Sequence, residues 1–201
     1  VDLKISIPVG KDSLSMRTKW DDNSVERVVK SPLSGVITAM APVNDVRTSI
    51  TPELNTEIAS KIIHVSLNDH KRLAGSIFSE VTQSSYSKTP DVDDMNSFKQ
   101  MFNAIQELVS EGKILALHDV SDGGLLTSLL EMAFTKKVGL DIVINDLDVK
   151  DLNSYFFAEE VGLVLQVNEV YLDEVAKVIT SAGSIANIIG NISVTKEFSI
   201  G

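Results

Sequence analysis

The sequence predicts an α+β fold in which helices cover a mixed sheet. From residue 61 onward, segments with the apolar pattern of strands alternate along the chain with segments of helical periodicity. Hydrophobic residues make up 43% of the 201 residues, which is enough to build a buried core. The polar stretch 82–90 predicts an exposed loop between two of these segments.

The first 54 residues predict strands and irregular connections. Residues 3–9 alternate between apolar and polar side chains, and residues 34–43 are small, apolar and β-branched, so we expect a strand in each range. Residues 21–24 between them give a turn signal. The chain starts at Val1 and enters the first expected strand at once, so we expect it to be a piece of a longer protein.

The clearest amphipathic helix is expected at residues 94–111, after a strand at 62–67. Asp93 or Asp94 can cap its N-terminus, and Gly112 can end it in the left-handed conformation. Its apolar side chains recur three and four residues apart: Met95, Phe98, Met101, Phe102, Ile105, Leu108 and Val109.

The rest of the chain continues the alternation. Residues 125–134 are apolar on nearly every face and predict a buried helix, whereas residues 170–182 have one apolar face and predict an amphipathic helix. Further strands are expected at 114–117, 138–144, 162–167, 185–190 and 193–200.

The composition argues against several classes of function. With 28 Asp and Glu residues against 18 Lys and Arg, the net charge of −10 opposes sequence-independent nucleic-acid binding. The absence of cysteine excludes disulfides, thiolate zinc sites and cysteine nucleophiles. We expect neither a membrane span, which needs roughly 20 apolar residues in a row, nor a secretory signal. The expected location is therefore the cytoplasm.

The segment between the strand at 114–117 and the helix after it carries the most chemistry. Unpaired N–H groups at a helix N-terminus favour anions, and glycines allow a phosphate to approach the backbone. Asp119 suits this setting as a ligand of a Mg²⁺ ion that also binds the phosphates, and Ser121 suits it as a hydrogen-bond donor to a nucleotide. Gly123 and Gly124 complete the predicted nucleotide-binding turn.

The same turn has a structural alternative. In that interpretation Ser121 or Asp122 caps the helix and the glycines form a tight turn, and local spacing alone favours it. The segment is not a Walker loop, because no Gly-Lys-Ser/Thr ends it. His118 is interpreted as a structural histidine and not as a general base, since the sequence places no titratable partner beside it.

Two further groups of polar residues have open roles. Lys11, Asp12, Ser13 and Ser15 form either a phosphate- or substrate-binding loop or a plain turn with an exposed ion pair. The carboxylates at 159–160 form either a metal or acid/base pair or a structural or partner-facing pair. Neighbours on a strand point to opposite faces, which favours the second interpretation.

Several motifs, taken in order, resemble those of the large formylglycinamide ribonucleotide amidotransferases. The motifs are IPVGKDSLSM at 7–16 with Trp20 behind it, SPLS at 31–34, DVR at 45–47, TPEL at 51–54, LHDVSDGGL at 117–125 and FAEEVG at 157–162. The resemblance implies two duplicated synthetase halves followed by a glutaminase domain. Residues 1–54 then end an N-terminal-type domain with its connection, and residues 55–201 form a C-terminal-type domain of the aminoimidazole ribonucleotide synthetase superfamily.

The resemblance also implies a reaction. Formylglycinamide ribonucleotide, ATP and glutamine give formylglycinamidine ribonucleotide, ADP, phosphate and glutamate, with Mg²⁺ as cofactor. Asp119 takes the position of a family Mg²⁺ ligand and Ser121 that of a nucleotide contact, while the other ligands and the glutaminase cysteine are expected elsewhere. The implied partners are the remaining synthetase domains and the glutaminase domain of the same full-length chain, so the isolated chain is expected to be inactive.

Two alternatives stay open beside this function. Because duplicated enzymes often keep only one half active, this half either takes part in chemistry or is a structural domain that holds a nucleotide. The second alternative is another ATP-using member of the superfamily, such as a selenophosphate or thiamine-phosphate enzyme, and the block at 10–16 argues against it.

Overall fold

The computed structural model describes residues 3–10, 16–31, 35–43, 45–144, 149, 151–193, 195 and 197–201. The chain divides into two compact units, Val1–Asn44 and Asp45–Gly201, which are described separately. The predicted loop residues Lys11, Asp12, Ser13 and Ser15 lie outside the described residues. None of the helices in the described ranges is long and apolar enough to cross a membrane.

The first unit contains a β-hairpin made of β1 (Arg17–Asp22) and β2 (Val25–Lys30). The two strands pair antiparallel over their whole length. Asn23 and Ser24 form the connection with φ values of 51° and 67°, the conformation that a two-residue hairpin turn requires. The turn lies within the range that the sequence predicted.

The prediction of strands at 3–9 and 34–43 is wrong for the residues that the structure describes in those ranges. Residues 3–10 and 35–43 take part in no ladder, and the paired strands lie between them. Val36, Ile37 and Met40 are each more than nine-tenths exposed, at 95%, 92% and 94%. An apolar, β-branched composition favours extended chain, but it does not identify the strand or the core that the segment faces.

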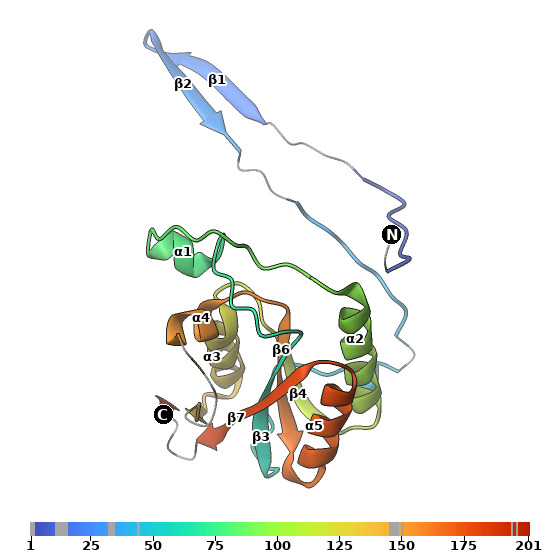
Figure 1. The fold of residues 1–201 in the computed structure, drawn as a ribbon. Coiled ribbons are helices and arrows are strands. Elements are labelled where there is room, and N and C mark those ends of the chain that lie inside the picture. The colour runs from blue at the N-terminus through green and yellow to red at the C-terminus, as the bar shows by residue number, and fades with distance from the viewer. Residues whose placement is uncertain are drawn as a thin grey trace. The chain divides into compact units, whose positions relative to one another are not determined.

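The second unit is built on a six-stranded mixed sheet (Figure 1). The strands lie in the order β4-β6-β3-β7-β5-β8, and every neighbouring pair is antiparallel except β5 with β8. The strands are β3 (Ser60–Ser66), β4 (Ile114–Asp119), β5 (Gly139–Ile142), β6 (Gly162–Asn168), β7 (Ile185–Ser193) and β8 (Phe198–Ile200). The predicted mixed sheet is confirmed.

Helices cover both faces of this sheet. Figure 1 shows α2 and α5 together beside one face and α3 with α4 beside the other. The helical segments are η1 (Val46–Thr48), α1 (Ile77–Val81), α2 (Met95–Ser110), α3 (Gly124–Lys136), α4 (Leu152–Phe157), η2 (Glu169–Tyr171) and α5 (Leu172–Ser181). The three predicted helices are confirmed as α2, α3 and α5, whereas α1 and α4 were not expected.

The caps that the sequence predicted for α2 are present. Asp94 accepts a hydrogen bond from the Asn96 N–H at 2.8 Å, which satisfies one of the unpaired donors of the first turn. Gly112 follows the helix with a φ of 69°, a conformation that glycine adopts without a Cβ penalty.

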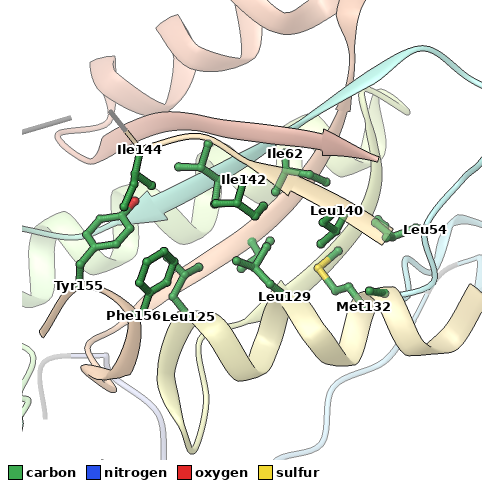
Figure 2. Packing of buried hydrophobic residues seen from close by; sticks show 14 residues of the cluster. Leu54, Ile62, Leu125, Leu129, Met132, Leu140, Ile142, Ile144, Tyr155 and Phe156 are labelled. Carbon is green, nitrogen blue, oxygen red and sulfur yellow. The ribbon is translucent and has the colours of Figure 1, made fainter. Parts of the chain in front are cut away.

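Alternating side chains of the central strand β3 separate the core into two clusters. Ile62 faces α3 and α4, whereas Ile63 and Val65 face α2 and α5. The first cluster, drawn in Figure 2, includes Leu54, Ile62, Leu125, Leu129, Met132, Leu140, Ile142, Ile144, Tyr155 and Phe156. Each fully buried side chain of this size contributes about 1.5–3 kcal/mol. This packing fixes the ends of β4 and α3, and with them the turn that joins the two elements.

Candidate functional site

The predicted nucleotide-binding turn joins the edge strand β4 to the helix α3. Asp119 is the last residue of β4, and its side chain is 74% exposed. The main chain then turns back, because the Gly124 N–H donates to the Ser121 carbonyl at 2.9 Å. The Val120 N–H extends the sheet contact by donating to the Gly162 carbonyl at 2.9 Å. The backbone is therefore held by hydrogen bonds where the turn begins, and the Asp119 side chain lies exposed to solvent.

Both glycines of the turn are required by its geometry. Gly123 and Gly124 have φ values of 88° and 75°, which non-glycine residues rarely adopt. A Cβ on Gly124 would also lie 2.6 Å from the Phe156 carbonyl oxygen and 2.7 Å from the Phe157 Cα. The backbone of α4 thus packs directly on the turn and fixes its shape.

The capping alternative for this turn is wrong. Gly123 occupies the N-cap position of α3, and no side chain caps the helix. Within the described ranges, Ser121 and Asp122 form no side-chain hydrogen bond. The polar side chains of the turn are therefore not used to stabilise the helix end, although the glycines do form the tight turn.

The N–H groups of the two glycines already have acceptors. Besides the Gly124 bond to Ser121, the Gly123 N–H donates to Glu159 Oε1 at 2.8 Å. The same oxygen accepts from the Ile77 N–H, at the start of α1, at 2.9 Å. The two glycines therefore shape the turn, and their amides are committed to protein acceptors. No local pattern signals the Glu159 contact, because the bonded residues lie 36 and 82 positions away from it along the chain.

Glu160, the neighbour of Glu159, forms a separate structural ion pair. Its Oε1 lies 2.7 Å from Arg72 Nε and its Oε2 lies 2.7 Å from Arg72 Nη2, and both side chains are largely buried. Arg72 also contacts Asp93 at 2.9 Å, and these carboxylates raise the pKa of the guanidinium. The structural interpretation of residue 160 is confirmed, and the two neighbouring carboxylates contact different groups.

His118 has structural contacts on both ring nitrogens. Its Nδ1 donates to the Asp119 carbonyl at 2.7 Å, and its Nε2 lies 3.1 Å from Glu131 Oε2 on α3. The Ser128 hydroxyl donates to the same Asp119 carbonyl at 2.9 Å. These bonds tie the end of β4 to α3, which supports a structural role for His118. The stated reason for that interpretation is wrong, because the structure places two carboxylates, those of Asp119 and Glu131, beside its ring.

A polar chamber lies beneath the turn. Its cavity of about 10 Å³ is lined by polar groups from β3, the loop after it, α4 and the segment that follows α4, with Val120 and Leu125 of the site also in the lining. The polar lining residues are His64, Ser66, Lys71, Tyr155 and Glu160. A space of this size holds about one water molecule. Sequence reasoning missed the chamber because these residues are spread over 97 positions of the chain.

Burial determines the charge states inside the polar chamber. Desolvation, helped by the charge of Lys71, lowers the pKa of His64 to about 3. Desolvation also raises the pKa of Tyr155 to about 12 and lowers the pKa of Lys71. Tyr155 Oη lies 3.3 Å from His64 Nδ1, so a neutral phenol and a neutral imidazole share one contact near neutral pH.

The turn supplies only some of the ligands that a metal ion needs. Mg²⁺ prefers oxygen ligands and is commonly held by one or two carboxylates together with substrate phosphates and water. Asp119 supplies one exposed carboxylate of this kind. Among the residues that the structure describes, no group of three or more acidic or histidine side chains converges on a metal position. The other ligands of a Mg²⁺ ion at Asp119 would therefore be phosphate oxygens, water or residues outside the described ranges.

The second unit is thus an α+β domain with a mixed sheet between two layers of helices, and a glycine turn joins its edge strand β4 to the buried helix α3. The family profile described as "AIR synthase related protein, C-terminal domain" matches residues 60–201, and the chain belongs to this family. A second profile, described as "FGAR-AT PurM_N-like domain", matches residues 1–42. These two matches confirm the predicted fold class and the resemblance to the formylglycinamide ribonucleotide amidotransferases.

Solved structures of similar fold include complexes of PurL from T. maritima. The complex with ATP matches at a TM-score of 0.59 and 12% identity, over 88% of this chain and 26% of that chain. The complex with FGAR matches at 0.62 and 10%, over 88% and 28%. E. coli HypE, a hydrogenase maturation protein, matches at 0.55 and 20%, over 76% and 49%. The chain thus spans about a quarter of the length of the PurL chains, and these likenesses show the fold.

Proposed function

We propose that this chain is the C-terminal-type domain, with the end of the preceding domain, of a formylglycinamide ribonucleotide amidotransferase of purine biosynthesis. The order of the two family matches, residues 1–42 before residues 60–201, supports the assignment. So do the T. maritima PurL structures, which are described as complexes with ATP, ADP, AMPPCP and FGAR. In this proposal residues 1–54 belong to the preceding N-terminal-type domain and its connection, and residues 55–201 form the C-terminal-type domain.

The complete enzyme converts formylglycinamide ribonucleotide, ATP and glutamine to formylglycinamidine ribonucleotide, ADP, phosphate and glutamate. Its partners for this chain are the remaining synthetase domains and the glutaminase domain of the same polypeptide. Because the chain covers 26% of the PurL chain complexed with ATP, we propose that it is inactive by itself. The pathway implies a cytoplasmic enzyme.

Asp119 is the residue that carries the proposed site. Its carboxylate is exposed at the end of β4, where His118 and Ser128 hold the main-chain carbonyl and His118 Nδ1 also lies 3.4 Å from Oδ1 of the carboxylate. We assign Asp119 as one Mg²⁺ ligand and Ser121 as a hydrogen-bond donor to the nucleotide. Gly123 and Gly124 provide the shape of the turn.

The chain's own residues bind and orient in this proposal. When bound, Mg²⁺ supplies neutralisation of the negative charge on the phosphates, on which phosphoryl transfer depends. The Ser121 hydroxyl donates to a phosphate oxygen, a bond to a charged group that contributes roughly 1.5–3 kcal/mol. We assign no residue of this chain as an acid, base or nucleophile.

A structural nucleotide is the second candidate for this turn. In the described part of the chain, the turn offers Asp119 and Ser121 to a ligand, while His118 is committed to Asp119 and Glu131. Such a site can hold a nucleotide without reacting with it. The duplicated architecture of the family makes a non-catalytic nucleotide in one half compatible with activity in the other.

The test compares Asp119→Asn and Ser121→Ala with the wild type in the full-length protein. Asp122→Asn is the matched control, since Asp122 is exposed in the same turn and is not assigned to the site. Bound nucleotide is quantified with and without Mg²⁺. We expect Asp119→Asn to lose Mg²⁺-dependent retention, because it removes a charged metal ligand. Ser121→Ala should weaken binding about tenfold or more.

The melting temperature separates the two candidates. If the nucleotide is structural, Asp119→Asn lowers the melting temperature, since a ligand that binds only the native state stabilises it by mass action. If the site is catalytic, activity falls while stability without nucleotide stays unchanged. Nucleotide content and melting temperature equal to those of the wild type under every condition would remove Asp119 from the site.

A further inference from the structure

Glu159 connects the candidate turn to two other elements through one carboxylate oxygen. Its Oε1 accepts from the Gly123 N–H at 2.8 Å and from the Ile77 N–H at 2.9 Å. Both N–H groups lie at the start of a helix, where the positive end of the helix dipole stabilises a carboxylate. Hydrogen bonds to a charged acceptor are also stronger than neutral ones. Glu159 is therefore held in place by the ends of α1 and α3.

The segment that carries Glu159 contacts the turn at a second point. Two and three residues before it, the α4 backbone at Phe157 and Phe156 leaves no room for a Cβ on Gly124. The Phe157 ring stacks on Phe78 of α1 with centroids 4.8 Å apart. The turn, α1 and α4 thus form one contact group, and Glu159 is its polar connection. The contact between Glu159 and the turn is made through the Gly123 N–H.

We propose that Glu159 is the positioning residue of the nucleotide turn. By holding the Gly123 N–H, it fixes the backbone that follows Ser121 and orients the two groups assigned to the nucleotide. This inference rests on the proposed function, because it gives Glu159 a role in presenting Asp119 and Ser121. Glu159 does not touch the ligand in this role.

The alternative roles of this carboxylate make opposite predictions. A purely structural contact stabilises α1 and α3 and leaves nucleotide affinity unchanged when it is removed. A carboxylate that competes with phosphates for the Gly123 N–H lowers affinity, so that its removal tightens binding. A positioning residue raises affinity, and its effect is kept by any side chain that can still accept both N–H bonds.

The experiment measures binding of Mg²⁺·ADP to the full-length protein carrying Glu159→Ala or Glu159→Gln. We expect Glu159→Ala to weaken binding about tenfold, the equivalent of one lost net hydrogen bond. Glu159→Gln should stay within about threefold of the wild type, because an amide oxygen still accepts both bonds. Glu174→Ala is the matched control, since Glu174 is an exposed carboxylate on α5 that pairs with Lys113.

Amide hydrogen exchange at Gly123 and Ile77 reports the contact directly. Exchange at both positions should be faster in Glu159→Ala and restored in Glu159→Gln. Unchanged or tighter binding in Glu159→Ala, while Asp119→Asn and Ser121→Ala lose nucleotide, would overturn the positioning role alone. Binding that Asp119→Asn and Ser121→Ala leave intact would overturn the proposed function, and the role of Glu159 with it.

Discussion

At the scale of single residues, His64 combines deep burial with a titratable ring. It lies in the middle of β3 and contacts the Tyr155 hydroxyl, and its ring packs edge-on to the phenol with centroids 5.6 Å apart. The Lys71 ammonium lies 6.0 Å from the centre of the same phenol ring, and Glu160 lines the cavity beside it. Protonation of His64 would place a second positive charge near Lys71 in a desolvated space. The folded state therefore holds the imidazole neutral.

This predicts acid sensitivity that originates at His64. The pKa of His64 is about 3 in the folded chain and about 6.5 in an unfolded chain. Between these values the unfolded chain binds the additional proton. The contribution of the neutral His64 ring to the free energy of unfolding is therefore complete above pH 6.5. It is lost as the pH falls toward 3, by at most about 1.4 kcal/mol per pH unit. Denaturant unfolding of His64→Gln should show a smaller loss between pH 7 and pH 5, by roughly 2 kcal/mol.

His70→Gln is the matched control for this experiment. The His70 imidazole lies at the surface, 3.8 Å from Asp93, so its substitution should leave the pH dependence close to that of the wild type. A His64→Gln chain that loses as much stability as the wild type between pH 7 and pH 5 would contradict the assignment.

At the scale of elements, the sequence predicted those parts whose signals are local. α2 was predictable because its apolar face repeats with helical period and both caps are encoded next to it. The hairpin of β1 and β2 was not, since both strands are exposed on both faces and show no apolar alternation. α1 and α4, with five and six residues, are too short for a periodic signal.

The same limit applies to the candidate site. The turn was predictable because Asp119, Ser121 and the glycines are adjacent in sequence. The Glu159 contact and the polar chamber were not, because they join residues that only the sheet brings together. His64 and Tyr155, for example, lie 91 positions apart. The groups that support the turn, such as Glu159, are therefore brought there by long-range packing, whereas the groups of the turn itself, such as Asp119, are set by local sequence.

The packing of α4 against the turn predicts a large effect at Gly124. Gly124→Ala forces a non-glycine residue to a φ of 75°, which costs about 1–2 kcal/mol. The new Cβ also collides with the α4 backbone, and overpacking of this kind adds about 1–3 kcal/mol. Denaturant unfolding should therefore show a loss clearly larger than strain alone produces.

Gly112→Ala isolates the contribution of strain. Gly112 has a φ of 69°, but no atom outside its immediate chain neighbours lies within 4 Å of the position that a Cβ would take, so its substitution adds strain without a collision. We expect Gly124→Ala to lose at least about 1 kcal/mol more than Gly112→Ala. Equal losses would mean that α4 moves away from the turn at little cost.

At the scale of the whole molecule, the two units differ in how they bury apolar side chains. The second unit has a core on each face of its sheet, including the fully buried Leu54 and Ile62. Within the first unit, both strands of the hairpin are exposed along their whole length. Its hairpin has two strands, and a two-stranded hairpin is marginal in water without further packing. We therefore expect the hairpin of the first unit to require packing against a further apolar surface in order to be stable.

The last prediction is that the 201-residue chain self-associates through its first unit. Val36, Ile37 and Met40 are exposed in one short segment, and exposed apolar patches and unpaired strand edges favour association. Light scattering of the whole chain should show oligomers that grow with concentration. Residues 45–201 alone should be monomeric and keep the melting temperature, since both cores lie within them. The triple change Val36→Ser, Ile37→Ser and Met40→Ser should shift the whole chain toward monomer. A whole chain that is monomeric at every concentration, with residues 35–43 as protected from hydrogen exchange as α2, would refute this, because those residues would then have found their core within the chain itself.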